Sequence, residues 1–188
     1  MAIRHIIAMP DPRLKVKSAP VERFDEALCA LVSDMFETMY DAPGIGLAAI
    51  QIGVPQRVLV IDLQERDADA EPERRGDEDS GDDHGAVRHD PLVFINPEIF
   101  DPSEELSIYN EGCLSVPEIY AEVERPARIH ARWQDLDGAV HEAEIDGLLA
   151  TCLQHEMDHL EGILFVDRLS RLKRQMALKK LGKARKAA

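Results

Sequence analysis

The sequence predicts an α+β fold, with antiparallel strands around a central metal-binding helix and a further helix at the C-terminal end. Several short segments are wholly apolar or alternate apolar with polar residues, which is typical of strands in antiparallel sheets. Residues 146–162 are instead apolar at helical spacing and contain the pattern HExxH, which places two histidines on one helix face, as a metal site requires. With 188 residues, 45% of them apolar, the chain can bury the core of a single domain spanning residues 1–188.

Charge, cysteines and hydropathy restrict where the protein works and what it binds. The formal net charge of −14 argues against binding of DNA, which depends on neutralising phosphates. Three cysteines (Cys29, Cys113 and Cys152) without paired spacing fit free thiols in a reducing compartment. No stretch approaches the length of a membrane span, and the first residues lack the pattern of a signal peptide. We therefore expect a cytoplasmic protein without a membrane partner.

The first third of the chain predicts one helix and one buried strand. Residues 25–40 place apolar side chains at helical spacing, with Asp25 as the N-cap and Phe24 as a hydrophobic staple. The stretch APGIGLAAIQIGVPQ at residues 42–56 is punctuated by glycine and proline but is too apolar for an ordinary surface loop. Residues 57–63, RVLVIDL, then predict a short buried strand.

Residues 64–90 differ in composition from the rest of the chain. They contain eleven acidic and four basic residues, a net charge of −7 (4 − 11), and no aromatic residue. Such a segment cannot bury enough apolar surface to offset the entropy lost when it becomes ordered. We predict that it is a flexible acidic insertion loop within the domain, and we interpret it as inert in the function.

Further strands are predicted before the metal-binding helix. Residues 91–100, PLVFINPEIF, form one such segment. Apolar and polar residues then alternate on either side of Asp137-Gly138, a strong signal for the turn of a β-hairpin. His130 lies on the polar face of this hairpin, so we interpret it as a solvated side chain rather than a metal ligand.

The C-terminal segment predicts a basic helix. Nine basic residues and one acidic residue follow Phe165. Four apolar side chains would dock part of this helix: Leu169, Leu172, Met176 and Leu178. Two interpretations of its charge stay open. The cations would either form a solvated face that suits a helix C-terminus, or bind an anionic partner such as ribosomal RNA.

A catalytic metal usually has three protein ligands, so His155 and His159 require a third. Two arrangements of HExxH sites place that ligand downstream. One needs an acidic residue on a later helix, but only Asp167 follows Glu161. The other needs a third histidine six residues beyond the second, where this chain has Phe165. The third ligand must therefore come from upstream.

Two cysteines are upstream candidates. Cys152 is close to the histidines in sequence, but it would stack with them in one helical row rather than converge on an ion. Cys113, in the stretch NEGCLSVP, belongs to a separate segment and follows a glycine that permits close backbone approach. A thiolate facing two imidazoles gives a Cys-His-His site with an open fourth position, which is typical of a catalytic metal.

Three segments together resemble the signatures of peptide deformylases: GIGLAAIQ at 44–51, EGCLS at 111–115 and QHEMDH at 154–159. PDPRL near the start and FINPEI in the middle extend the resemblance, which covers essentially the whole chain except the acidic insertion. Three motifs in register make a specific match, whereas HExxH alone is a weak one. The resemblance implies a hydrolase of protein biosynthesis that removes the N-formyl group from the N-terminal methionine of newly synthesised proteins and releases formate.

The resemblance also implies roles for the metal-site residues. Cys113, His155 and His159 would hold the ion. The family points to Fe2+, and the donor types would also accept Zn2+, Ni2+ or Co2+. Glu156 would take a proton from water that the metal acidifies and pass it to the leaving amine.

Other roles implied by the resemblance surround the metal. The side chain of Gln51 and the backbone N–H of Leu114 would stabilise the oxyanion. Glu111 and Arg125 would form a buried ion pair, and Asp158 would orient a ligand or a nearby loop. The substrate-binding residues would be Ile45, Gly46, Tyr109, Glu111, Leu148, Thr151 and Cys152. Some relatives carry an arginine where this chain has Ile119 and Tyr120, which leaves the contacts to the second and third substrate residues open.

Two other classes of protein are weaker alternatives. An HExxH metallo-endopeptidase acting on internal bonds predicts a downstream ligand, which this chain lacks. A non-catalytic module on the same fold predicts loss of Glu156, Gln51 or Cys113, and all three are present. We therefore predict a single catalytic domain that acts on N-formylmethionyl nascent polypeptides, with the ribosome as a candidate partner of the C-terminal helix.

Overall fold

The computed structural model describes residues 2–66 and 87–187, and the elements named below belong to these ranges. The helices are α1 (Glu26–Asp41), α2 (Gly147–Leu160) and α3 (Arg171–Ala187), with short 3-10 helices η1 (Pro12–Lys15), η2 (Ala49–Ile52) and η3 (Phe165–Asp167). The strands are β1 (Gly46–Ala48), β2 (Val58–Ile61), β3 (Glu65–Arg66), β4 (Val87–Arg88), β5 (Leu92–Phe100), β6 (Leu106–Cys113), β7 (Val116–Pro126), β8 (Arg128–Gln134) and β9 (Val140–Asp146). Among the helices of the described ranges, none combines the length and apolar character needed to cross a membrane.

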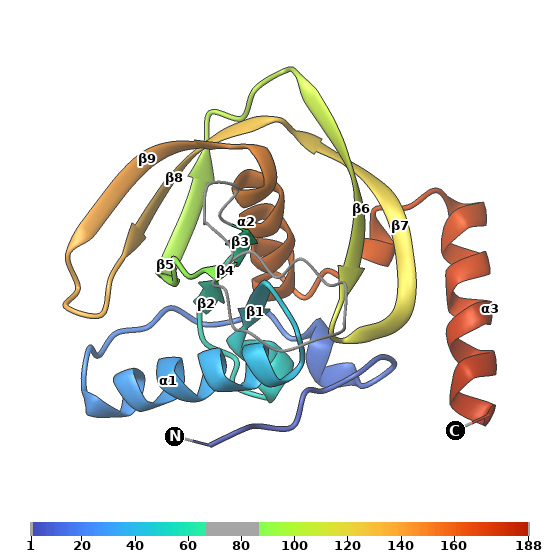
Figure 1. Ribbon diagram of the computed structural model, residues 1–188, viewed down its shortest axis with the longest axis horizontal. Coiled ribbons are helices and arrows are strands. Elements are labelled where there is room, and N and C mark those ends of the chain that lie inside the picture. The colour runs from blue at the N-terminus through green and yellow to red at the C-terminus, as the bar shows by residue number, and fades with distance from the viewer. Residues whose placement is uncertain (1, 67–86, 188) are drawn as a thin grey trace, which may run out of the picture.

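Two antiparallel layers enclose α2. Five strands form a sheet in the order β1-β2-β5-β8-β9, and β6 pairs with β7 in a separate long hairpin. In Figure 1, α2 lies between the sheet and this hairpin, α1 runs along the bottom, and α3 stands outside β7. This arrangement confirms the predicted α+β fold, with antiparallel strands around a central helix and a helix at the C-terminal end.

The strand β2 is buried on both faces, which explains its uninterrupted apolar sequence. Leu59 packs in one apolar cluster with Leu153 of α2. The adjacent Val58 and Val60 point the other way and pack in a second cluster with Met35 of α1. The two helices therefore cover opposite faces of the sheet, and the short buried strand predicted at 57–63 is confirmed.

The predicted first helix is confirmed as α1. The Asp25 side chain accepts hydrogen bonds from the backbone N–H groups of Ala27 (3.1 Å) and Leu28 (3.2 Å). It thereby satisfies two of the donors that a helix start leaves unpaired. Phe24 is half-buried against the α1 cluster, as a hydrophobic staple would be.

The central helix α2 is buried along most of its length. Asp146 precedes it in extended conformation, and the helix ends at Leu160. Two residues later, Gly162 has a φ of 72°, and a Cβ atom at this position would lie 2.5 Å from the carbonyl oxygen of Lys15. Only glycine fits there, and Gly162 therefore ends the helix in the way typical of a C-terminal glycine.

The predicted hairpin around Asp137-Gly138 is formed by β8 and β9. Gly138 has a φ of 78°, as the turn requires. Ile129 is buried against α2, whereas His130 faces away from it. The His130 ring is half-buried rather than fully solvated, and it lies 3.6 Å from the carboxylate of Glu144.

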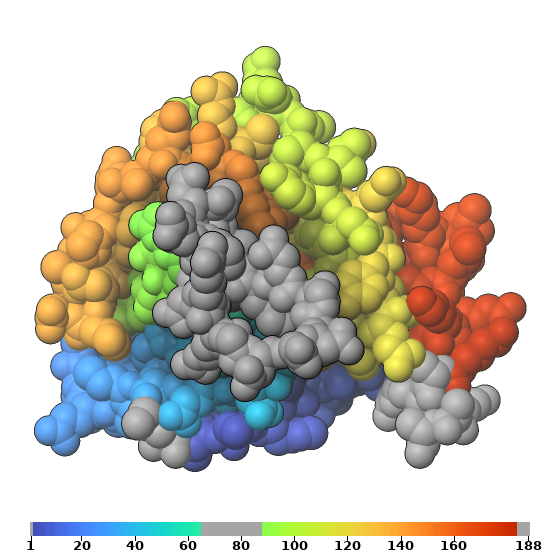
Figure 2. Space-filling model, in the orientation of Figure 1, coloured from blue at the N-terminus to red at the C-terminus, as the bar shows by residue number. Residues whose placement is uncertain are grey.

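The apolar contacts of α3 differ from the prediction. Of the four predicted docking residues, two are half-buried and two are exposed: Leu169 and Leu178 in the first group, Leu172 (69%) and Met176 (64%) in the second. Leu181, only 5% exposed, anchors the helix instead, with Ala177 one turn before it. The prediction for Leu172 and Met176 was wrong because α3 contacts β7 through a narrow stripe at 177 and 181. Figure 2 shows α3 at the outer edge of the molecule.

Only the ends of the predicted acidic insertion belong to the described residues. There β3 pairs with β4 in a short antiparallel ladder. Residues 67–86 lie outside the described ranges, so the flexibility predicted for the loop stays a prediction, as does the assignment of residues 1–188 to a single domain.

Candidate metal centre and substrate pocket

A thiol and two imidazoles converge where β6 meets α2. Cys113 ends β6, while His155 and His159 lie one turn apart on α2. One ligand atom from each residue lies within 4.8 Å of the others, and Cys113 Sγ is 3.3 Å from His159 Nε2. The structure thus brings together the three residues predicted as metal ligands, one from β6 and two from α2.

The hairpin aims Cys113 at α2 through an irregular tip. Cys113 pairs with Val116 across a turn formed by Leu114 and Ser115. The pairing register shifts between Glu111 and Cys113. Such a shift redirects a side chain out of the regular alternation of a strand, and here it turns the thiol inward.

His155 is held by a buried ion pair. Its Nδ1 lies 2.8 Å from Glu111 Oε2, and Arg125 donates hydrogen bonds to both oxygens of that carboxylate (2.6 and 2.9 Å). Burial opposes ionisation of Glu111, but the hydrogen bonds from Arg125 and His155 outweigh it and lower the pKa of Glu111 to about 2. With Nδ1 engaged in this way, Nε2 is the nitrogen of His155 that remains for a metal.

The same contacts act on the protonation of His155. Burial alone would lower its pKa, but hydrogen bonds with Cys113 and Glu111 outweigh burial and raise the pKa of His155 to about 10. Because a metal ligand must be neutral imidazole, uptake of a cation at this site has to displace a proton. Metal affinity is therefore expected to rise with pH.

The environment of His159 is different. It is 1% exposed, and its Nδ1 has no hydrogen-bond partner among the described residues. Burial, followed by the nearby charges of His155 and Arg125, lowers the pKa of His159 well below its ordinary value. His159 is therefore neutral, and its Nε2 already faces Cys113 Sγ.

Glu156 lies between the two histidines in sequence and is 4% exposed. Burial raises its pKa to about 7, and the positive charges of His155 and Arg125 offset only part of that effect. Its Oε1 lies against Gly46 of β1, where a Cβ atom would be only 2.6 Å away. Glycine at this position therefore leaves room for the Glu156 carboxylate.

Gln51 approaches the thiol from η2. Its Oε1 accepts a hydrogen bond from the backbone N–H of Ala48 (2.8 Å), which fixes the orientation of the amide. Its Nε2 donates to Ser115 Oγ (3.1 Å) and lies 3.7 Å from Cys113 Sγ. Leu114, the other predicted oxyanion donor, occupies the adjoining turn. Two amide groups of different segments thus adjoin the thiol.

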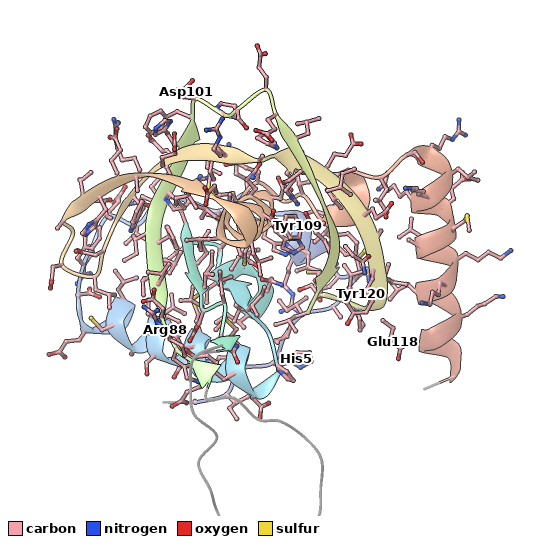
Figure 3. The ribbon with its side chains drawn as sticks, turned by 45° about the horizontal axis from the view of Figure 1, so that its top comes forward. His5, Arg88, Asp101, Tyr109, Glu118 and Tyr120 are labelled. Atoms are coloured by element: carbon pink, nitrogen blue, oxygen red, sulfur yellow. The ribbon has the colours of Figure 1, made fainter. Side chains whose placement is uncertain are left out.

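A cavity of about 390 Å3 opens beside these groups. It is lined by all seven residues predicted to bind the substrate: Ile45, Gly46, Tyr109, Glu111, Leu148, Thr151 and Cys152. Ile45 and Leu148 are 36% and 39% exposed and form its mouth, whereas Thr151 lies at its buried end. Tyr109 and Tyr120 reach it from the two strands of the hairpin (Figure 3). Tyr120 lines the cavity although it is 69% exposed.

Cys152 is part of the cavity wall and not of the cluster of ligand atoms. Its Sγ lies 3.9 Å from the carbonyl oxygen of Ile45. Burial, reinforced by the negative charge of Glu156, raises the pKa of the Cys152 thiol well above its ordinary value. A protonated, buried thiol is a packing group, which agrees with its exclusion as a ligand.

Sequence reasoning missed the residues that hold β1 beside the cavity. Gln64 donates a hydrogen bond from Nε2 to the carbonyl oxygen of Gly44 (2.8 Å). The backbone N–H of Asp62 donates to the carbonyl oxygen of Ile45 (2.9 Å). The Asp62 side chain is fully buried and accepts from Tyr40 Oη (2.7 Å). An aspartate directly after a buried apolar strand was the available signal, since such a charge requires partners.

Comparison of the sequence with known proteins gives full-length matches. The family model described as "Polypeptide deformylase" matches residues 3–175. The chain is 72% identical to the peptide deformylase of Novosphingobium aromaticivorans over 188 residues, covering 100% of both proteins. It is 60% identical to that of Zymomonas mobilis over 186 residues, covering 99% of this chain and 97% of the relative.

Solved structures match over a similar extent. The crystal structure of a peptide deformylase from Legionella pneumophila matches with a TM-score of 0.81 and 44% identity, covering 99% of this chain and 97% of that chain. The peptide deformylase from Ehrlichia chaffeensis in complex with actinonin matches with a TM-score of 0.81 and 39% identity, covering 98% of each chain.

Proposed function

The chain belongs to the polypeptide deformylase family, and from this premise we propose that Glu156 moves the proton in its reaction. The protein is a metal-dependent hydrolase that removes the formyl group from the N-terminal methionine of newly synthesised polypeptides. Water cleaves the formyl C–N bond, which yields formate and a free amino terminus. The reaction therefore requires a Lewis acid, a proton carrier and donors for the oxyanion.

The residues present fit a divalent metal. A thiolate and two imidazoles suit Fe2+, Zn2+, Ni2+ or Co2+, and three protein ligands leave a coordination position open. We assign the ligands as Cys113, His155 and His159, and Fe2+ as the physiological ion because of the family resemblance. When bound, the ion supplies a Lewis acid that polarises the formyl carbonyl and acidifies water.

Glu156 is suited to carry the proton. Its pKa of about 7 lies near the pH of the cytoplasm, so the carboxylate accepts a proton and returns it with little loss of driving force. One of its oxygens, Oε2, is buried without a hydrogen-bond partner among the described residues, so it would have to accept one from the reacting water. In the proposed cycle Glu156 takes the proton from water and delivers it to the leaving nitrogen.

Gln51 and Leu114 are the proposed oxyanion donors. The Ala48 N–H bond to Gln51 Oε1 turns the NH2 end of the amide toward Cys113. A donor fixed in advance stabilises the negative charge of the tetrahedral intermediate without reorganisation. The backbone N–H of Leu114, in the turn after Cys113, would supply a second donor.

The cavity beside the metal site is proposed to bind the methionine side chain. Its wall combines apolar groups with the Cys152 thiol, which suits an unbranched thioether. Glu111 lines the cavity too, but its charge is already paired with Arg125. It therefore closes the wall and does not attract a cation.

The convergence of Cys113 with the two histidines is the observation that carries this proposal, and removal of Cys113 tests it. Formate release from a formyl-Met tripeptide would be measured with anaerobically purified protein loaded with Fe2+ or Ni2+. Cys113→Ser should lower kcat/KM by at least about 100-fold, because loss of a ligand should exceed the effect of a disturbed outer partner. Cys29→Ser, which changes an exposed thiol elsewhere, is the matched control and should retain full activity.

An internal, unformylated peptide would be tested in parallel. Cleavage of this peptide without formate release would contradict the assignment and move the chain to the metallo-endopeptidases. Formate release that survives in Cys113→Ser would place the third ligand elsewhere. Metal analysis of the anaerobically purified protein would test the proposal of Fe2+ directly.

Actinonin offers a second probe of the pocket. It occupies the related enzymes from Ehrlichia chaffeensis and Synechococcus elongatus, whose structures were solved as complexes. We propose that it binds the cavity of this chain and raises the melting temperature of the metal-loaded protein. Gly46→Ala, which places a methyl group against Glu156 and Cys152, should weaken that stabilisation.

Two further assignments concern location and partner. We propose that the protein acts in the cytoplasm, where its three free thiols stay reduced. We also propose that the basic helix α3 contacts the ribosome. The exposed cations of α3 face outward, and the substrate of the enzyme is a nascent chain.

The ribosome proposal is tested by charge reversal rather than by truncation, because Leu181 belongs to the core and a truncated chain would lose it. The double variant Lys179→Glu and Lys183→Glu should abolish co-sedimentation with ribosomes in low salt. Arg23→Glu with Arg132→Glu changes the net charge equally, in the segment before α1 and on β8, and should co-sediment normally. Equal behaviour of the two double variants would refute the assignment of α3.

A further inference from the structure

A line of charged side chains leads from the metal-site histidine to the surface. His155 lies against Glu111, which accepts two hydrogen bonds from Arg125. Arg125 also donates from Nη1 to Asp158 Oδ2 (2.9 Å). Both oxygens of Asp158 in turn accept hydrogen bonds from Arg168. Arg168 was not among the residues predicted from the sequence.

Burial along this line is uneven. The side chains of Arg125, Glu111 and Asp158 are 2%, 5% and 8% exposed, whereas that of Arg168 is 43% exposed. Arg168 is thus the member that reaches water. It belongs to the segment between η3 and α3 and lines a surface hollow of about 650 Å3.

The charges alternate along the line, and Arg168 completes the alternation. Without it, Arg125 alone would face two buried carboxylates, Glu111 and Asp158. When His155 is a neutral metal ligand, one buried negative charge on these two carboxylates would then lack a partner, which is costly in a protein interior. Arg125 could reduce that cost only by shifting toward Asp158, which would weaken its hydrogen bonds to Glu111.

We propose that Arg168 is a positioning residue for the metal site, holding Asp158 so that Arg125 stays on Glu111 and Glu111 stays on His155. The arrangement requires arginine, because its planar guanidinium engages both oxygens of one carboxylate. A lysine would offer a single point charge. This inference rests on the proposed function, in which His155 is a metal ligand.

The alternative is an ordinary surface ion pair. Half-exposed pairs between arginine and carboxylate often contribute little to stability. The neighbouring pair between Arg174 and Asp167 supplies the comparison. Arg174 is 47% exposed and lies 2.8 Å from Asp167 Oδ1, and Asp167 is not part of the line. Arg174→Gln therefore removes a similar pair from the same region without touching the line to His155.

Metal retention tests the proposal without relying on catalysis. Protein loaded with Co2+ would be mixed with excess chelator, and loss of the ion would be followed by its visible absorption. Arg168→Gln should lose Co2+ about 10-fold faster than wild type, at the lower end of the effects of disturbing an outer partner of a ligand. Arg168→Lys should fall between the two, and Arg174→Gln should match wild type.

The kinetics provide a second readout. With saturating metal, Arg168→Gln should regain most of its kcat and keep the KM of wild type, because the substrate cavity does not include Arg168. Metal loss from Arg168→Gln at the rate of Arg174→Gln would overturn the proposal. If Cys113→Ser also retained Co2+ normally, the ligand assignment itself would be wrong, so the two failures are distinguishable.

Discussion

His155 and His159 lie one turn apart on α2, yet their hydrogen-bond partners differ. His155 contacts a carboxylate that is itself bound by Arg125, whereas Nδ1 of His159 has no hydrogen-bond partner among the described residues. Burial lowers the pKa of both histidines, but only at His155 do hydrogen bonds, with Cys113 and then Glu111, outweigh it, so the two pKa values move in opposite directions. The fold therefore orients the His155 ring by a hydrogen bond at Nδ1, whereas, within the described ranges, Nδ1 of His159 is surrounded by packing alone.

Glu111→Gln should cause the largest loss of stability among the variants that test this contrast. It removes the buried negative charge that pairs with Arg125, and breaking a buried pair costs about 3–5 kcal/mol. Urea unfolding of the metal-free protein at pH 7 would measure the loss. Glu142→Gln is the control, since its pair with Arg132 is half exposed on both sides and should change stability by no more than about 1 kcal/mol.

The pH dependence of that difference sharpens the test. The pKa of Glu111 is lowered from 4.5 to about 2, so its contribution to stability is complete above pH 4.5 and is lost as the pH falls toward 2. The gap between wild type and Glu111→Gln should therefore narrow over this range. A gap that stays constant down to pH 3 would show that the charge of Glu111 does not matter.

Glu156→Gln should have the opposite effect from Glu111→Gln on the stability of the metal-free protein. The pKa of Glu156 is raised from 4.5 to about 7. The stability that its protonated form contributes is therefore complete below pH 4.5 and is lost as the pH rises through 7. Removing the charge should stabilise the fold by about 3 kcal/mol above pH 7 and leave it unchanged below pH 4.5. In the metal-loaded enzyme the same variant should lower kcat about 100-fold or more, because the proton carrier is lost.

The smallest expected effect is the difference in stability between variants of the two histidines. In metal-free protein, His155→Leu removes a partner of Glu111 and should cost about 1–3 kcal/mol. His159→Leu removes an imidazole whose Nδ1 is already unpaired, so its free energy of unfolding should stay within about 1 kcal/mol of wild type. Equal losses in chemical denaturation would contradict the contrast between the two sides of the helix.

The sequence was sufficient to predict that Cys113, His155 and His159 converge, because the chemistry of a metal site restricts the choice of residues. Two histidines at helical spacing require a third donor, and the downstream positions offered none. The alternation around Asp137-Gly138 and the apolar run at 57–63 were likewise enough for the hairpin and for β2. These signals are local, and local spacing fixes which face of an element is apolar.

Spacing does not reveal what covers that face, and this limit explains the misses. Leu172 and Met176 have the spacing of a docking stripe, but β7 meets α3 elsewhere, at Ala177 and Leu181. Arg168 belongs to a run of cations that is solvated for most of its length. Only the fold shows that this one cation turns inward to Asp158.

The irregular tip of the hairpin has a consequence for how the protein is maintained in a cell. Cys113 and His159 are 46 residues apart in the chain and belong to β6 and α2, so an ion bound between them would act as a cross-link. An ion that binds only the folded chain stabilises it in proportion to the logarithm of its free concentration. Metal scarcity would then reduce the amount of protein that escapes proteolysis as well as the activity of each molecule.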